Sequence, residues 1–162
     1  MTTPYGVVPR PIRLDYTYTT GEAAARFLRA IQQKKLIGQR CPNCAKVYIP
    51  PRGSCPTCGV PTRDDVEVKD TGTVTTFCIV NIPFPGMAVK PPFAAASVLL
   101  DGADIAIFHL IQEIPADEVR MGLRVKAVWV PDSDLTPTME SIAHFKPSGE
   151  PDAPYDSYKD QL

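Results

Sequence analysis

Two Cys-x-x-Cys pairs constrain this chain more than any other feature of its sequence. They lie in CPNCAKVYIPPRGSCPTCG, residues 41–59, and supply Cys41, Cys44, Cys55 and Cys58. Zn²⁺ is held by four thiolates at the corners of a tetrahedron, and each Cys-x-x-Cys turn can present two of them. The segment between the pairs can run out as a short strand, turn at Pro-Pro-Arg-Gly and return. We therefore predict one structural zinc ion per chain, bound by these four thiolates.

Other interpretations of the cysteines are weaker. Two disulfides, or four unrelated core cysteines, fit poorly because the N-terminal sequence has no apolar signal segment and we expect a reducing, cytoplasmic setting. A thioredoxin-type redox pair requires a surrounding β-α-β pattern, which neither pair has. A catalytic zinc keeps one coordination position open, whereas four thiolates leave none. The fifth cysteine, Cys78, lies in an apolar strand pattern, and we interpret it as a small buried hydrophobic residue.

The composition is that of an ordinary globular protein. The chain has 162 residues, of which 44% are hydrophobic and 22% charged, and its net charge is −1. No apolar run approaches the roughly 18 residues that a membrane span requires, so we expect no membrane association. The balanced charge also argues against general attraction to nucleic acid.

Two segments precede the cysteines. Residues 1–20 carry prolines among scattered aromatic residues, which favours an extended arm over a helix. From Ala24 onward, apolar residues recur at helical spacing. Thr19 and Glu22 are spaced as a capping box, and Gly38 is placed as a C-terminal stop. We predict an amphipathic helix of about four turns that packs either on the rest of the chain or on a partner.

The region after the cysteines is rich in strand patterns. The expected strands are 71–82, 93–100, 105–111, 124–130 and 141–145. Asp-Gly at 101–102 joins the second and third strands, and PADEVRMG after the third suits one or two helical turns. Five strands with a short helix between the third and fourth follow the order of an OB-fold barrel. The polar, proline-bearing segment after Pro147 is expected to be disordered.

These patterns predict a mainly β protein in four parts. The parts are an arm and amphipathic helix (1–38), a rubredoxin-like zinc ribbon (39–69), a five-stranded OB-fold barrel (70–146) and a disordered tail (147–162).

The order of these elements resembles a known family. The chain is similar to the zinc-ribbon/OB-fold proteins associated with acyl-CoA enzymes, a family long filed as a domain of unknown function. The similarity lies in the order of four parts: a helix, RCPNCAKVYIPPRGSCPTCG, TGTVTTF and GLRVKAVW. The resemblance runs from about Gly21 to Phe145. It implies an accessory subunit that pairs with thiolase-superfamily enzymes, including lipid-transfer-protein-type aldolases, or with acyl-CoA hydratases. Residue by residue, it carries over only the four ribbon cysteines.

The resemblance also implies a function. This chain is expected to be a non-catalytic subunit of a hetero-oligomer that completes an aldolase acting on a steroid side-chain CoA thioester. A subunit of an acyl-CoA hydratase or of an acetyltransferase/thiolase complex is the alternative. The chain is thus expected to be inactive alone, an obligate component of a lyase or acyltransferase complex, with the CoA thioester as a ligand of that complex.

The residues themselves offer no catalytic set. The sequence has no G-x-S-x-G, no H-E-x-x-H and no glycine-rich phosphate loop. His109 could titrate near neutrality, but it lies among apolar neighbours in a strand pattern. We interpret it as a structural hydrogen-bonding residue rather than a general base.

Two segments are candidates for contact with a partner. The loop at residues 83–93 is apolar, and it either forms an interaction site or folds back over the mouth of the barrel. The arm either trails freely or becomes ordered on another subunit. The candidate contacts with a partner or an acyl-CoA are Tyr16, Tyr18, Phe27, Phe84, Met87, Phe93 and His109.

Two further classes of function are less well supported by the sequence. A zinc ribbon joined to an OB-fold can bind single-stranded nucleic acid, but the expected strands carry few cations. An independent acyl-CoA enzyme, such as a thioesterase, would need a nucleophile or base that the sequence does not display. A salt-dependent shift with an oligonucleotide favours the first class, and turnover of an acyl-CoA by the single chain favours the second.

Overall fold

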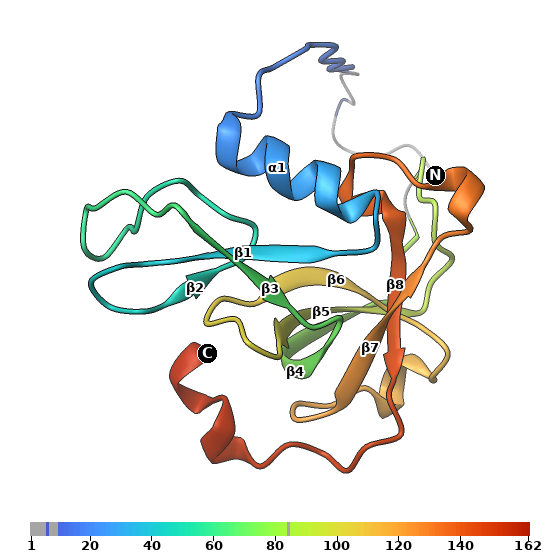
Figure 1. Cartoon of the computed structure of the whole chain (residues 1–162). Helices are drawn as coiled ribbons and strands as arrows, with labels where there is room; N and C mark the ends of the chain where they lie inside the picture. The colour runs from blue at the N-terminus through green and yellow to red at the C-terminus, as the bar shows by residue number, and fades with distance from the viewer. Residues whose placement is uncertain (1–5, 7–9, 84) are drawn as a thin grey trace.

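A small antiparallel sheet and a closed barrel lie side by side beneath one helix (Figure 1). The computed structural model describes residues 6, 10–83 and 85–162, and every structural statement below refers to these residues. The observed fold confirms the predicted class: mainly β, with a helix near the N-terminus, a ribbon that carries the cysteines and a five-stranded OB-like barrel.

The helix α1, Glu22–Ile31, is shorter than predicted. It begins after Gly21, whose φ of 79° suits glycine, and no side chain caps it, so the predicted capping box is wrong. It ends at Ile31 rather than at Gly38, because the following residues are recruited into a sheet. No helix in the described part of the chain has both the length and the apolar character needed to cross a membrane.

The ribbon sheet consists of three short antiparallel strands in the order β2-β1-β3. They are β1, Leu36–Arg40; β2, Val47–Tyr48; and β3, Asp64–Val68. Gly38 lies in the middle of β1, where an added Cβ would come within 2.7 Å of Val47 Cγ1. Glycine is therefore needed here for close packing within the sheet and not to end a helix.

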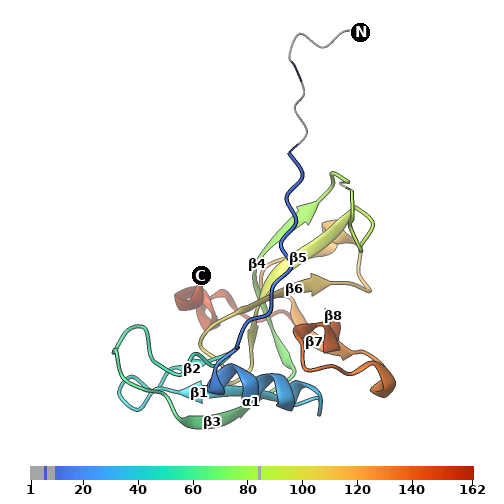
Figure 2. The same ribbon diagram turned by 90° about the horizontal axis from the view of Figure 1, so that it is seen from above.

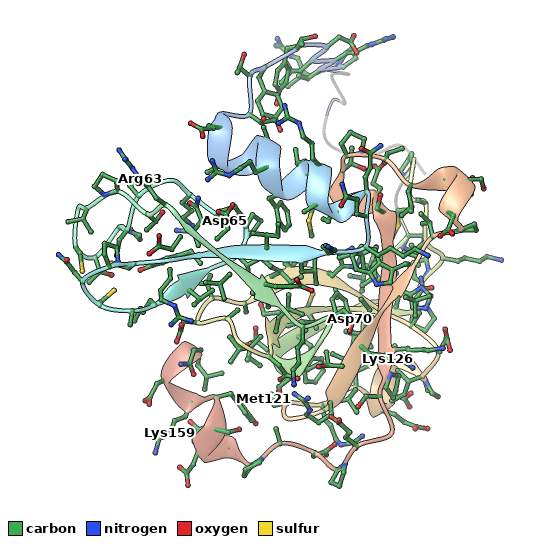
Figure 3. The ribbon with its side chains drawn as sticks, in the orientation of Figure 1. Arg63, Asp65, Asp70, Met121, Lys126 and Lys159 are labelled. Carbon is green, nitrogen blue, oxygen red and sulfur yellow. The ribbon has the colours of Figure 1, made fainter. Side chains whose placement is uncertain are left out.

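A buried glutamine ties the cysteine-bearing loops to this sheet. Gln39 on β1 is fully buried, and its Nε2 donates to Asp65 Oδ1 at 3.1 Å. Its Oε1 accepts from Gly53 N at 3.2 Å and from Thr62 Oγ1 at 3.0 Å. Asp65 lies on β3 near α1 (Figure 3), where Arg26 also pairs with it. The polar groups of this side chain are thus satisfied, as burial requires.

The barrel closes in the order β4-β5-β6-β8-β7, which is the predicted OB order. The strands are β4, Thr71–Val80; β5, Phe93–Leu100; β6, Ile107–Ile111; β7, Arg124–Trp129; and β8, Ile142–Pro147. The short helix η1, Ala116–Glu118, lies between β6 and β7 as expected. The parallel junction of β6 with β8 is narrow, because its register contains the single pair Ile111 and Phe145.

The helix, the ribbon and the barrel share one hydrophobic core. Phe27 and Ile31 of α1 belong to the same buried cluster as Val47 of the ribbon and Phe145 of the barrel. A barrel loop also covers the free edge of β2: Asp104 N donates to Val47 O at 2.9 Å, and Val47 N donates to Asp104 Oδ2 at 2.8 Å. The apolar face of α1 therefore packs on this chain, and α1 lies alongside the ribbon strands (Figure 2).

The C-terminal segment is ordered, so the prediction of a disordered tail is wrong. It contains two short 3₁₀ helices, Tyr155–Ser157 and Lys159–Gln161, and runs along the barrel near Met121 (Figure 3). Tyr158 is only 4% exposed. Asp152 accepts two hydrogen bonds from the Arg120 guanidinium, at 2.6 and 2.8 Å. One buried aromatic ring and this bidentate ion pair hold a segment whose composition is otherwise polar.

Candidate metal centre

The four predicted ligands converge at the tip of the ribbon. The Sγ atoms of Cys41, Cys44, Cys55 and Cys58 all lie within 4.8 Å of one another. Zn–S bonds of about 2.3 Å in a tetrahedron place sulfurs roughly 3.8 Å apart. The Sγ atoms of Cys44 and Cys55 are 3.7 Å apart, close to that value and far beyond a disulfide bond of about 2.05 Å. The donor set therefore fits a tetrahedral metal ion.

The two cysteine turns have the same backbone geometry. Ala45 N donates to Cys41 O at 3.0 Å, and Gly59 N donates to Cys55 O at 2.9 Å. Ala45 and Gly59, each following the second cysteine of its turn, have left-handed φ values of 61° and 67°. Glycine adopts this conformation without strain, whereas alanine does not. The turn that ends at Gly59 is therefore unstrained, whereas the turn that ends at Ala45 is strained.

A tyrosine next to the cluster influences the thiols. The Tyr48 hydroxyl lies 3.2 Å from Cys55 Sγ, and this hydrogen bond lowers the pKa of the Cys55 thiol to about 6. Hydrogen bonding to Cys44 raises the pKa of Cys58 to about 12. The buried Tyr48 packs with Cys41 and Cys55 in a small cluster of its own, separate from the main core. Apart from its place in the strand between the cysteine pairs, nothing in the sequence pattern predicts this role for Tyr48.

Zinc bound here would act as a cross-link. The four thiolates would hold the two turns together and leave no coordination position for a substrate. Backbone amides that point at the sulfurs, such as Cys58 N at 3.4 Å from Cys55 Sγ, would stabilise the negative charge of the thiolates.

Comparisons with known proteins agree with this geometry. Residues 29–62 match the family model described as the rubredoxin-like zinc ribbon domain of ChsH2, and residues 65–130 match its C-terminal OB-fold domain. A DUF35 domain-containing scaffold protein of Methanocaldococcus jannaschii is 32% identical over 96 residues, which cover 58% of this chain and 67% of that protein. This chain belongs to the DUF35 family. Its tip is a rubredoxin-like zinc ribbon with four cysteines positioned to bind a metal.

Other proteins are also similar to this chain. A probable enoyl-CoA hydratase alpha subunit of Thermomonospora curvata is 32% identical over 113 residues, or 69% of this chain; the chain spans only 35% of that protein's length. The structure named Ltp2-ChsH2(DUF35) aldolase superposes with a TM-score of 0.62 at 26% identity, covering 82% of this chain and 99% of that one. A DUF35 protein of unknown function from Sulfolobus solfataricus shares the fold. It superposes with a TM-score of 0.61 at 22% identity, and the match covers 80% of this chain and 87% of that chain.

His109 lies at the narrow junction between β6 and β8. Its Nδ1 accepts a hydrogen bond from Leu110 N at 2.9 Å, and its ring contacts Phe145 edge-on with centroids 5.7 Å apart. Burial lowers the pKa of His109, while hydrogen bonds to the backbone of Met139 and Ile142 act in the opposite direction. These bonds join β6 to the short 3₁₀ helix Met139–Ser141 and to the start of β8, which otherwise share little pairing with it. The structural role of His109 remains a prediction, and this geometry is compatible with it.

The remaining candidate contacts are spread over the surface. Tyr16 and Tyr18 are 76% and 69% exposed, whereas Phe27 is 2% exposed in the core and is thereby removed from the set of partner contacts. Met87 and Phe93 are half-buried, as is His109. Phe84 lies outside the described residues. The structure therefore gathers the metal ligands at one point but does not gather these seven residues.

The expectation that Cys78 is buried is wrong. Its side chain is exposed, although Phe77 and Ile79 beside it are apolar. Pairing of β4 with β7 is confined to Thr71–Thr73, so the second half of β4 has only β5 as a neighbour. The sequence pattern could not distinguish a strand inside the closed barrel from one that runs past it.

Proposed function

We propose that this chain is a non-catalytic accessory subunit that completes an acyl-CoA enzyme of the thiolase superfamily, namely an aldolase. The observation that carries the proposal is the match with the Ltp2-ChsH2(DUF35) aldolase, which extends over 82% of this chain and 99% of that one. An accessory subunit needs a stable fold and a surface that binds its partner, and it does not need catalytic residues of its own.

Exposed apolar side chains supply the surface that binds the partner. Ile82, in the loop after β4, and Phe108 on β6 are 78% and 66% exposed, and the arm adds further large apolar residues. Contiguous exposed apolar surface often marks a contact site with another protein. The hollow of about 450 Å³ beside Phe108 is lined by Leu110, Met139 and Ile142, and it extends this apolar surface.

The proposed reaction is the retro-aldol cleavage of a steroid side-chain β-hydroxyacyl-CoA. In that reaction the bond between Cα and Cβ breaks, the hydroxyl loses its proton to a base, and Cα gains a proton. We assign these proton transfers to the partner. This chain forms one wall of the acyl-CoA channel, and its ribbon holds that wall in place.

A second candidate is a subunit of an acyl-CoA hydratase. The Thermomonospora curvata relative, a probable enoyl-CoA hydratase alpha subunit, favours it. The two candidates differ in the bond that the complex breaks. Loss of water from a β-hydroxyacyl-CoA indicates the hydratase, and release of a carbonyl fragment indicates the aldolase.

Pairwise co-expression with each thiolase-superfamily subunit of the source organism tests the proposal. We expect a stable complex with one of them, detected by size exclusion with light scattering. Deletion of residues 1–18, or Phe84→Ser combined with Met87→Ser, should weaken it at least about tenfold while leaving the barrel folded. Tyr155→Ser, at an exposed position on the C-terminal segment, is the control and should have no effect. Absence of any complex would rule out the proposal.

A further inference from the structure

The arm before α1 has the sequence pattern of a β-strand. Large apolar side chains occupy Ile12, Leu14, Tyr16 and Tyr18, and polar residues occupy every position between them. Side chains of a strand alternate between two faces, so one face of this segment is apolar and the other polar. Contacts within the arm follow the same alternation. Tyr16 and Tyr18 lie together with ring centroids 6.2 Å apart, and on the other face Arg13 Nε donates to Asp15 Oδ2 at 2.6 Å.

The described residues leave the apolar face of this segment largely uncovered. Ile12, Leu14, Tyr16 and Tyr18 are 85%, 78%, 76% and 69% exposed. Residues 10–20 make no backbone–backbone hydrogen bond with any other described residue. The arm runs out from the start of α1, away from the ribbon (Figure 2). A strand-forming sequence with a bare face and free backbone groups is suited to pairing with another sheet.

We propose that residues 11–19 add as a strand to a sheet edge of the partner subunit, with the apolar face buried against it. The inference rests on the proposed function and specifies how the two subunits are joined. Burial of an extended segment removes water from its N–H and C=O groups, and pairing with an edge strand replaces those lost hydrogen bonds. The alternating side chains then provide specificity.

Most sheet edges among the described residues are paired, covered or charged, and only the second half of β4, which has β5 alone as its neighbour, is left open. The five barrel strands form a closed ring, and Asp104 covers the edge of β2. The outer edge of β3 carries Asp64, Asp65 and Glu67, and charged edge strands resist pairing. At the junction of β6 with β8, His109 bonds to the backbone of the opposite segment. The arm makes no backbone hydrogen bond with the open part of β4, although both belong to the same chain, so we assign the arm to a sheet edge of the partner subunit.

The size of the arm agrees with a stabilising interface. Two tyrosines, a leucine and an isoleucine, each at least 69% exposed, offer on the order of 500 Å² of largely apolar surface. A stable interface buries about 800 Å² per partner. The arm alone thus supplies more than half of what is needed, and the exposed barrel residues can supply the rest.

Paired variants of the full-length chain test this inference in the co-expressed complex. Leu14→Ser combined with Tyr16→Ser removes half of the apolar face and should weaken the complex about a hundredfold. Arg13→Ser combined with Thr17→Ser alters only the polar face and should change its Kd less than about threefold. Hydrogen exchange at single-residue resolution should show every second amide between residues 11 and 19 protected in the complex.

The outcomes separate the two proposals. If no thiolase-superfamily subunit binds the wild-type chain, the proposed function fails and the inference fails with it. If the complex forms but both double variants bind equally, or the arm amides stay unprotected, the strand inference alone is wrong. Arm-dependent dimerisation of the isolated chain in sedimentation analysis would assign the strand to a second copy and overturn the choice of partner.

Discussion

The ribbon and the barrel reach a defined shape by different means. The ribbon sheet has strands of two to five residues, whereas the barrel strands have five to ten and close on themselves. Near the cysteines, Cys41, Tyr48 and Cys55 form a cluster separate from the core that the base of the ribbon shares with the barrel. Short strands with few buried neighbours cannot order a sheet by burial alone. We therefore expect the tip of the ribbon, but not the barrel, to depend on a bound metal.

Removal of one thiolate from the cluster should have the largest effect, and it should unfold the tip of the ribbon while the barrel stays folded. Cys55→Ser should abolish zinc binding because it removes one of the four thiolates. The tip should then unfold, since structural zinc contributes on the order of 10 kcal/mol to folding in isolated fingers. We expect the amides of residues 41–60 to lose protection from hydrogen exchange while the barrel amides keep theirs. Cys78→Ser, at an exposed cysteine outside the cluster, is the matched control. Equal loss of protection in both regions would show that the tip and the barrel unfold together.

The converse change removes a large side chain from the barrel. Phe145→Ala creates a cavity at a fully buried position and should lower the free energy of unfolding by about 3–5 kcal/mol. Zinc content, measured by elemental analysis, should stay at one ion per chain at temperatures below the transition. Phe108→Ala, at an exposed position of the same barrel, should cost less than about 0.5 kcal/mol. Loss of zinc from the folded Phe145→Ala variant would contradict the independence of the tip.

His109 is expected to contribute to the barrel alone. His109→Gln should lower the free energy of unfolding by about 1–3 kcal/mol, because backbone groups of Met139 and Ile142 lose a buried partner. The effect on the turnover of a reconstituted complex should be smaller. A fall of about a thousandfold in kcat with unchanged folding would instead identify a general base.

The same histidine predicts a dependence of stability on pH. The folded state has a pKa below the ordinary value, so it binds a proton less readily than the unfolded chain. The contribution of His109 is therefore complete above about pH 6.5 and declines as the pH falls from there toward the folded pKa. His144 lies near enough to disfavour a second positive charge, and Glu140 lines the adjoining hollow. Denaturant titrations of wild type and His109→Gln at pH 5 and 7.5 should show a larger pH effect in wild type.

The smallest expected effects compare the two cysteine turns. Ala45→Gly should stabilise the tip by about 1 kcal/mol because glycine relieves the left-handed conformation, and Gly59→Ala should destabilise it by a similar amount. Competition with a chelator measures both changes as opposite shifts in zinc affinity. Shifts of the same sign would mean that the two turns are not equivalent.

The sequence predicted the parts of the molecule that depend on local pattern. Cysteine spacing identified the four residues whose thiols converge as a candidate metal site, and alternation with turn residues located the five barrel strands to within a few residues. Features that depend on contacts between residues far apart in the sequence were predicted wrongly. Gly38 is required by Val47 across the sheet and not by a helix end, and Tyr158 orders a polar tail by finding a site on the barrel. Cys78 is exposed because the strand beside it stops short, which no local pattern records.

The most direct test of the accessory role is an assay of three samples with one steroid side-chain β-hydroxyacyl-CoA. The samples are the thiolase-superfamily partner alone, this chain alone, and the two mixed at equal concentrations. We predict release of the carbonyl fragment only from the mixture, and loss of that activity when the chain carries Leu14→Ser and Tyr16→Ser. A soluble partner that is fully active without this chain, or turnover by this chain alone, would contradict the account.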